Sequence, residues 1–70
     1  MQMKVKKIAV GNRSRVYCIA GQKNFVWRWR KDEERWAHIL SPCPFVEIAV
    51  GHDGVVFCVD QNHKMWWLYD

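Results

Sequence analysis

One tetrapeptide, Ile-Ala-Val-Gly, stands twice in this chain, at residues 8–11 and again 40 positions later at residues 48–51. The residues that follow the two copies stay in step without a gap. The matched pairs are identical or similar in character: Val16 and Val56, Cys18 and Cys58, Trp27 and Trp67, Tyr17 and Phe57, Ile19 and Val59, Trp29 and Tyr69. A period of this size is typical of architectures in which one supersecondary unit is stacked several times. We therefore expect a repeat protein.

The composition indicates a folded chain with more aromatic surface than a monomer of this size buries. Of the 70 residues, 50% are apolar and 14% are aromatic, including five Trp. Some of these side chains are expected to contact another subunit or a ligand. The net charge of +4 permits an anionic partner without requiring one.

The cysteines and the apolar runs bear on the compartment. Three Cys cannot all pair within the chain, and Cys18 and Cys58 occupy equivalent places in apolar runs, so we expect buried free thiols. No run resembles a signal-peptide core or reaches the ~20 apolar residues of a membrane span. The sequence predicts a cytoplasmic or otherwise intracellular protein with no membrane partner.

Alternation of apolar and polar residues predicts strands throughout and no long helix. The expected strands cover residues 4–10, 15–20, 25–30, 35–40, 45–50, 55–60 and 64–69. The alternation is strictest in 25–30, where three aromatic residues share one face and Val26, Arg28 and Arg30 share the other. Such a strand is expected to be half-buried.

A proline pair, Pro42 and Pro44, interrupts the strands and divides the chain into two units. The predicted fold class is all-β, with two antiparallel meander β-propeller blades of four strands and three. Residues 1–40 are expected to form the first blade, 41–44 the inter-blade linker, and 45–70 the second, incomplete blade. A small barrel or a two-layer sandwich is the alternative.

Short motifs recur in the same order in both units. The first unit carries Ile8-Ala9-Val10-Gly11, Val16-Tyr17-Cys18-Ile19, Trp27-Arg28-Trp29-Arg30 and Trp36-Ala37-His38-Ile39. The second carries Ile48-Ala49-Val50-Gly51, Asp53-Gly54, Val56-Phe57-Cys58-Val59 and Trp66-Trp67-Leu68-Tyr69. In this order the chain resembles the tectonin repeat family, whose propeller blades also occur in tachylectin-like lectins. The resemblance implies a non-catalytic recognition module, often for sugars.

The number of units bears on assembly, because two blades cannot close a ring and repeat units generally need about three copies for stability. We expect identical chains to complete the ring as a homo-oligomer, most simply as a trimer with six blades. The alternative is that the chain is a fragment of a longer propeller.

No catalytic motif, metal-ligand spacing or phosphate loop is present in the sequence, so we expect neither an enzyme, nor a metal site, nor a cofactor. The candidate ligand-binding residues lie in polar turns, on the basic strand face and at one tryptophan: Asn12, Arg13, Arg28, Arg30, His52, Asp53 and Trp66. Arg28 and Arg30 lie ~7 Å apart on one strand face. Guanidinium pairs next to tryptophan suit phosphate binding together with base stacking. A solvated face paired with neighbouring acidic residues is the simpler interpretation.

The tryptophans divide into packing residues and a candidate binding residue. Trp27 and Trp67 match by spacing, so both are interpreted as inter-blade packing. Trp66, whose counterpart by spacing is Val26, is the candidate for a special surface, either a subunit contact or a ligand contact.

Three functional hypotheses follow from these features. The first is a homo-oligomeric, lectin-like β-propeller that recognises a carbohydrate. The second is a small sequestering or inhibitory protein that binds a nucleotide, a nucleic acid or another anionic small ligand through an Arg/Trp face. The third is a purely structural self-assembly module.

Overall fold

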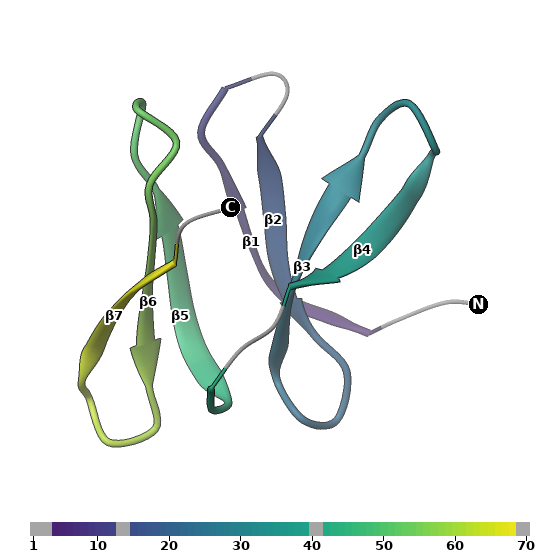
Figure 1. Cartoon of the computed structure of the whole chain (residues 1–70). Helices are drawn as coiled ribbons and strands as arrows, with labels where there is room; N and C mark the ends of the chain where they lie inside the picture. Colours follow the sequence, from purple (N-terminus) through teal and green to yellow (C-terminus); the bar gives the residue numbers. More distant parts are fainter. Residues whose placement is uncertain (1–3, 13–14, 40–41, 69–70) are drawn as a thin grey trace.

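The computed structural model describes residues 4–12, 15–39 and 42–68, and over these ranges the chain consists of strands, turns and short connections. Seven strands follow one another (Figure 1): β1 (Val5–Val10), β2 (Val16–Ala20), β3 (Phe25–Arg30), β4 (Arg35–Ile39), β5 (Phe45–Val50), β6 (Val56–Asp60) and β7 (Met65–Leu68). Each begins and ends within one residue of its predicted bounds. The predicted last residues Leu40 and Tyr69 lie outside the described ranges. No helix capable of crossing a membrane is found in the described part of the chain.

The strands form two antiparallel sheets, with the orders β1-β2-β3-β4 and β5-β6-β7. Each strand pairs with its neighbour in sequence, so both sheets are meanders, and the predicted all-β class with four strands plus three is confirmed. The sheets stand side by side in Figure 1, and β5 is the strand of the second sheet that contacts β1 and β2.

The two sheets share an irregularity at equivalent positions. The pairing register shifts between Val5 and Lys7 in β1, and between Phe45 and Glu47 in β5. A bulge of this kind bends a strand and increases its twist. The 40-residue repeat of the sequence is therefore also a repeat of backbone structure in the first two strands of each sheet.

The hydrophobic core lies between the sheets. Its fully buried members come from both: Tyr17, Ile19 and Val26 from the first sheet, and Phe45, Val56 and Cys58 from the second. Partly buried apolar residues pack against them: Ile39, Cys43, Ile48, Val50 and Leu68. Burial of this apolar surface is the main force that holds the two sheets together, at about 25 cal/mol for each Å² removed from water.

The face of β3 that enters the core is the one that carries Val26. This residue is fully buried and pairs with Ile19 on β2 and Ile39 on β4. The aromatic residues of β3 lie on the opposite, outward face of the sheet, where Trp27 packs on His38 with 5.0 Å between ring centroids. The strand is half-buried as its alternation predicts, and the second sheet covers its smaller apolar residue.

The sequence spacing matches Trp27 with Trp67, but the strand pairing in the structure shows that this match is wrong. Trp27 pairs with Cys18 in β2, whereas the residue that pairs with the equivalent Cys58 in β6 is Trp66. A shift of one residue moves every side chain of a strand to the other face of the sheet. Trp66 is therefore the structural counterpart of Trp27, and Trp67 points outward from the second sheet.

The cause of this shift is the turn that precedes β7. In the first sheet Ala20 pairs with Phe25 across the turn 21–24, whereas the N–H of Asp60 bonds to the carbonyl of Lys64 at 2.9 Å, across a turn one residue shorter. The carboxylate of Asp60 holds this shorter turn, because its Oδ1 accepts the backbone N–H groups of Asn62 and Lys64 at 2.8 and 2.9 Å. Alanine, at the equivalent position of the first unit, cannot do this.

Candidate functional site

Three turns lie at one end of the two sheets: β1–β2, β3–β4 and β5–β6 (Figure 1). The β1–β2 and β5–β6 turns are closed by the same backbone hydrogen bond. Gly11 N–H donates to Arg15 O, and Gly51 N–H donates to Val55 O, each at 2.9 Å. The repeat therefore presents two turns that are closed in the same way. Inside them the bonds differ, because Arg15 N–H donates to Asn12 O whereas Val55 N–H donates to the side chain of Asp53.

Two glycines allow these turns to pack closely. A Cβ on Gly11 would lie 2.6 Å from a methyl carbon of Val50, so only glycine fits there without a shift of β5. Gly54 has a φ of +91°, and a Cβ on it would lie 3.0 Å from the guanidinium of Arg15. The contact between Arg15 and Gly54 joins the first turn to the second.

Four of the predicted site residues belong to these two turns. Asn12 and His52 occupy equivalent places, and both are exposed. Asp53 is also exposed, and its Oδ1 accepts the N–H of Val55 at 3.2 Å, so one oxygen of this carboxylate holds the turn. Arg13 lies outside the described residues.

A pocket of about 460 Å³ lies where β3 enters the β3–β4 turn. Five consecutive residues line it: Arg28, Trp29, Arg30, Lys31 and Asp32. The lining carries three cationic groups and one carboxylate, so its net charge is positive. The structure thus places both predicted arginines at the end of the sheets that carries Asn12, His52 and Asp53.

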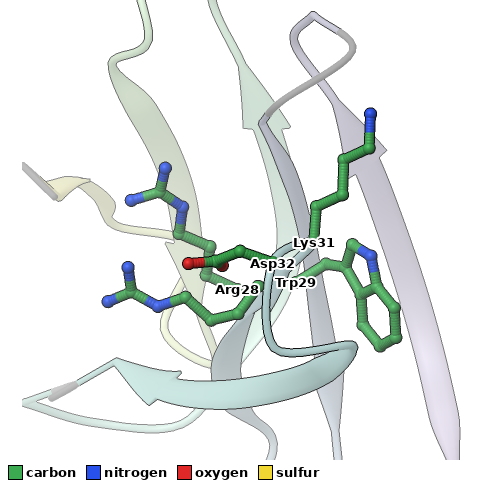
Figure 2. A pocket seen from close by; sticks show the side chains of 5 residues that line it. Arg28, Trp29, Lys31 and Asp32 are labelled. Carbon is green, nitrogen blue, oxygen red and sulfur yellow. The ribbon is translucent and has the colours of Figure 1, made fainter.

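The pocket residues extend to both sides of β3. In Figure 2, Arg28 and Asp32 extend to one side of the strand, while Trp29 extends to the other. The guanidinium carbon of Arg28 lies 6.0 Å from the ring centre of Tyr17, within reach of a cation–π contact. Trp29 packs edge-on against Trp36, with 5.4 Å between ring centroids. Arginine and indole therefore do not share one face, as combined phosphate binding and base stacking on a single surface would require.

Trp66 lies apart from the other candidates. It stands near the start of β7, at the end of the second sheet opposite the β5–β6 turn (Figure 1). Its indole N–H donates to Asp60 Oδ2 at 2.9 Å, and its ring packs edge-on against Phe45 with 6.3 Å between centroids. These contacts stabilise the β6–β7 hairpin and the core, and they leave 37% of the residue exposed.

Sequence reasoning missed several residues that matter structurally. Trp29, Lys31 and Asp32 line the pocket, and their position directly beside the two arginines was the available signal. The carboxylate of Asp60 accepts three hydrogen bonds, from Asn62, Lys64 and Trp66, and the sequence signal was an acidic residue where the first unit has Ala20. Hydrogen bonds from Trp66, Lys64 and Asn62 hold the pKa of Asp60 below its usual value.

The three cysteines carry free thiols in unreactive surroundings. Burial raises the pKa of Cys18 to about 11. Burial, with a contribution from Cys43, raises the pKa of Cys58 to about 12. The pKa of Cys43 is raised by burial and by Asp60, so all three thiols stay protonated near neutral pH and are weak nucleophiles.

Metal binding has no support among the described residues, where no group of three or more His, Cys, Asp or Glu side chains could hold an ion. Comparison of the chain with known protein families, with curated proteins and with solved structures found no match.

Proposed function

We propose that this protein is a non-catalytic binding module, a tectonin-like β-propeller that recognises a carbohydrate at the end formed by the β1–β2, β3–β4 and β5–β6 turns. The observation that carries the proposal is the pocket of about 460 Å³ at the end of β3. Arg28 and Asp32, which extend to the same side of β3, supply the hydrogen-bond donors and acceptors that sugar hydroxyls need, and Trp29 on the other side of the strand offers a separate flat apolar surface. The exposed Asn12, His52 and Asp53 add further polar groups at the same end.

A glycan array followed by calorimetry on the best hit tests this proposal. We expect Asp32→Asn to weaken sugar binding by about tenfold, because loss of a charged acceptor costs about 1.5 kcal/mol or more. Glu34→Gln is the matched control, since Glu34 lies in the same turn, is exposed, and does not line the pocket. Equal affinities of the two variants, or an array without hits, would contradict the carbohydrate proposal.

The charge of the pocket favours a second candidate function, the capture of an anionic ligand such as a nucleotide or nucleic acid. The lining contains three cationic side chains, those of Arg28, Arg30 and Lys31, and only one carboxylate. Binding of this kind weakens steeply between low and physiological salt, whereas binding of a neutral sugar changes little. Lys31→Ala should reduce the salt dependence, and Lys23→Ala, an exposed lysine of the β2–β3 turn, should leave it unchanged.

We also propose that identical chains complete the propeller ring, most simply as a trimer with six blades. Apolar side chains exposed on both outer sheet surfaces support this: Ile8, Val10, Met65 and Trp67. Native mass spectrometry at micromolar concentration tests it, and a monomer alone would contradict it. If the ring forms and neither the glycan array nor a nucleotide panel yields a ligand, a structural self-assembly role is the function that remains.

The unreactive thiols support an intracellular location for this module. Cys18 and Cys58 are buried and free, and free thiols persist in reducing compartments. A fluorescently tagged full-length chain found outside the cell would contradict this part of the proposal.

A further inference from the structure

The contact between the two sheets joins two different surfaces. The first sheet contributes the face that carries Tyr17, Ile19 and Val26, and the second contributes the face that carries Val56 and Cys58. A contact between unlike surfaces of repeated units is heterologous, and it can be repeated by further units in the same direction.

Because the two units repeat, each outer side of the chain carries one of these two surfaces, and the two outer sides carry different ones. On the outer side of the first sheet, Ile8 and Val10 are the counterparts of Ile48 and Val50, which pack against the core from the second sheet. We call this surface, with Trp27, the N face. Ile8 is 61% exposed and Val10 is 60% exposed, so both lack the cover that their counterparts have.

The outer side of the second sheet carries the other half. Phe57 and Val59 are the counterparts of Tyr17 and Ile19, which form the first sheet's half of the core contact. We call this surface, with Met65 and Trp67, the C face. It holds a shallow hollow of about 190 Å³ lined by Glu47, Ile48, Ala49, Phe57, Val59 and Met65.

The register of β7 makes the C face more apolar than its counterpart. Trp67 pairs with Phe57 as Arg28 pairs with Tyr17, so an indole stands where the first sheet has a guanidinium. The ring of Trp67 lies 6.2 Å from that of Phe57, and 54% of the residue is exposed. An exposed tryptophan beside Met65, which is 55% exposed, marks a surface suited to a partner.

A charge pair between the sheets indicates which partner fits. Lys7 Nζ lies 3.3 Å from Glu47 Oε1, and these residues occupy the same position of the two repeats. If a second copy packed on the second sheet in the same way, Glu47 would lie next to Lys7 of that copy. Positive and negative charges would then alternate along the assembly. Packing of either face on a copy of itself would instead bring two glutamates or two lysines together, which is unfavourable.

From these observations we infer that the C face of one chain packs on the N face of a second copy, head to tail, in the arrangement that the two sheets adopt within the chain. This inference rests on the proposed self-assembly and specifies its surfaces and its direction. Trp67 and Met65 of one copy cover Ile8 and Val10 of the next. The ligand-binding turns lie at the end of the sheets, so the interface leaves them open.

Two complementary double variants test the direction of packing. The N-face variant is Ile8→Glu with Val10→Glu, and the C-face variant is Met65→Glu with Trp67→Glu; all four side chains are more than half exposed, so the fold of one chain should tolerate them. We expect the native chain to form multimers and each variant alone to remain monomeric in native mass spectrometry. A mixture of the two should yield a 1:1 heterodimer and no larger species, because only one intact N face and one intact C face remain.

The possible outcomes separate the two proposals. A native chain that remains monomeric overturns self-assembly and the inference with it, whereas sugar binding is measured independently. A native multimer whose variants also assemble, or whose variants do not combine on mixing, overturns the head-to-tail arrangement alone. Should a double variant fail to fold by circular dichroism, Glu47→Lys provides the test on an exposed residue, and we expect it to weaken assembly at least severalfold. The double variant Lys7→Glu with Glu47→Lys should restore assembly, because it exchanges the two charges.

Discussion

The indole N–H of Trp66 donates to the carboxylate of Asp60 at 2.9 Å, whereas the indole N–H of Trp27, at the matching place of the first sheet, is buried without a hydrogen-bond partner among the described residues. The difference follows from one position, because Ala20 stands where the second unit has Asp60. This acidic residue also sets the length of the β6–β7 turn and so the register of β7. One side chain therefore decides which tryptophan faces the core and which faces outward.

Removal of that carboxylate should destabilise the second sheet. We expect Asp60→Ala to lower Tm by roughly 5–10 °C, since two backbone N–H groups and the indole of Trp66 lose their acceptor together. Asp60→Asn keeps one acceptor oxygen for the turn and should lower Tm less. Differential scanning calorimetry measures both, and an unchanged Tm of Asp60→Ala would contradict the role assigned to this residue.

Asp60 should also make the stability of the folded chain depend on pH. Hydrogen bonds from Trp66, then from Lys64 and Asn62, lower the pKa of Asp60 in the folded chain below its ordinary value of 3.8. The folded state therefore binds a proton less readily than the unfolded state, and its stabilisation is complete well above pH 3.8 and is lost as the pH falls through the folded pKa. Urea unfolding between pH 7 and pH 2.5 should show less of this loss in Asp60→Asn; identical profiles for the two proteins would contradict the assignment.

The cysteines should differ in reactivity with position. Cys18 and Cys58 are fully buried and their pKa values are raised to about 11 and about 12, so iodoacetamide should not modify them in the folded chain at pH 8. Cys43 is partly exposed and should react first, more slowly than a free thiol because its pKa is also raised. Peptide mass spectrometry after a timed pulse measures the order, with the urea-unfolded chain as control. Early labelling of Cys58 would show that the space between the sheets is open to solvent.

The β1–β2 and β5–β6 turns should be coupled through Gly54. Gly54→Ala places a methyl group 3.0 Å from Arg15 at a φ of +91°, so it should cost more than the roughly 1–2 kcal/mol of backbone strain alone. Gly21→Ala is the matched control, because its φ is +82° and its Cβ would meet open space. Urea denaturation of both variants gives the difference in their free energies of unfolding. Adding Arg15→Ala to Gly54→Ala should recover part of the lost stability. Equal losses of stability in Gly54→Ala and Gly21→Ala would contradict the coupling.

Alternation and the proline pair were enough to predict the strands and their division into two sheets. Alternation in segments such as 25–30 places every strand within one residue of its bounds, because a strand with one buried face must repeat every second residue. The internal period also matched the segments 5–10 and 45–50 as the first strands of one repeated unit, and the structure gives both strands the same register shift. The polar turns at one end followed from the same alternation, since strands of a meander reverse direction at each turn.

Which faces are covered and which residues meet depends on the packing of the two sheets and could not be read from the sequence. The spacing matched Trp27 with Trp67, yet hydrogen bonds to Asp60 shortened one turn, and a one-residue shift in a strand exchanges its two faces. Alternation in β3 likewise left open whether its aromatic face or Val26 was buried, because both faces carry apolar residues and only packing of the second sheet selects one. Local patterns specify strands, whereas burial depends on contacts between segments far apart in the chain.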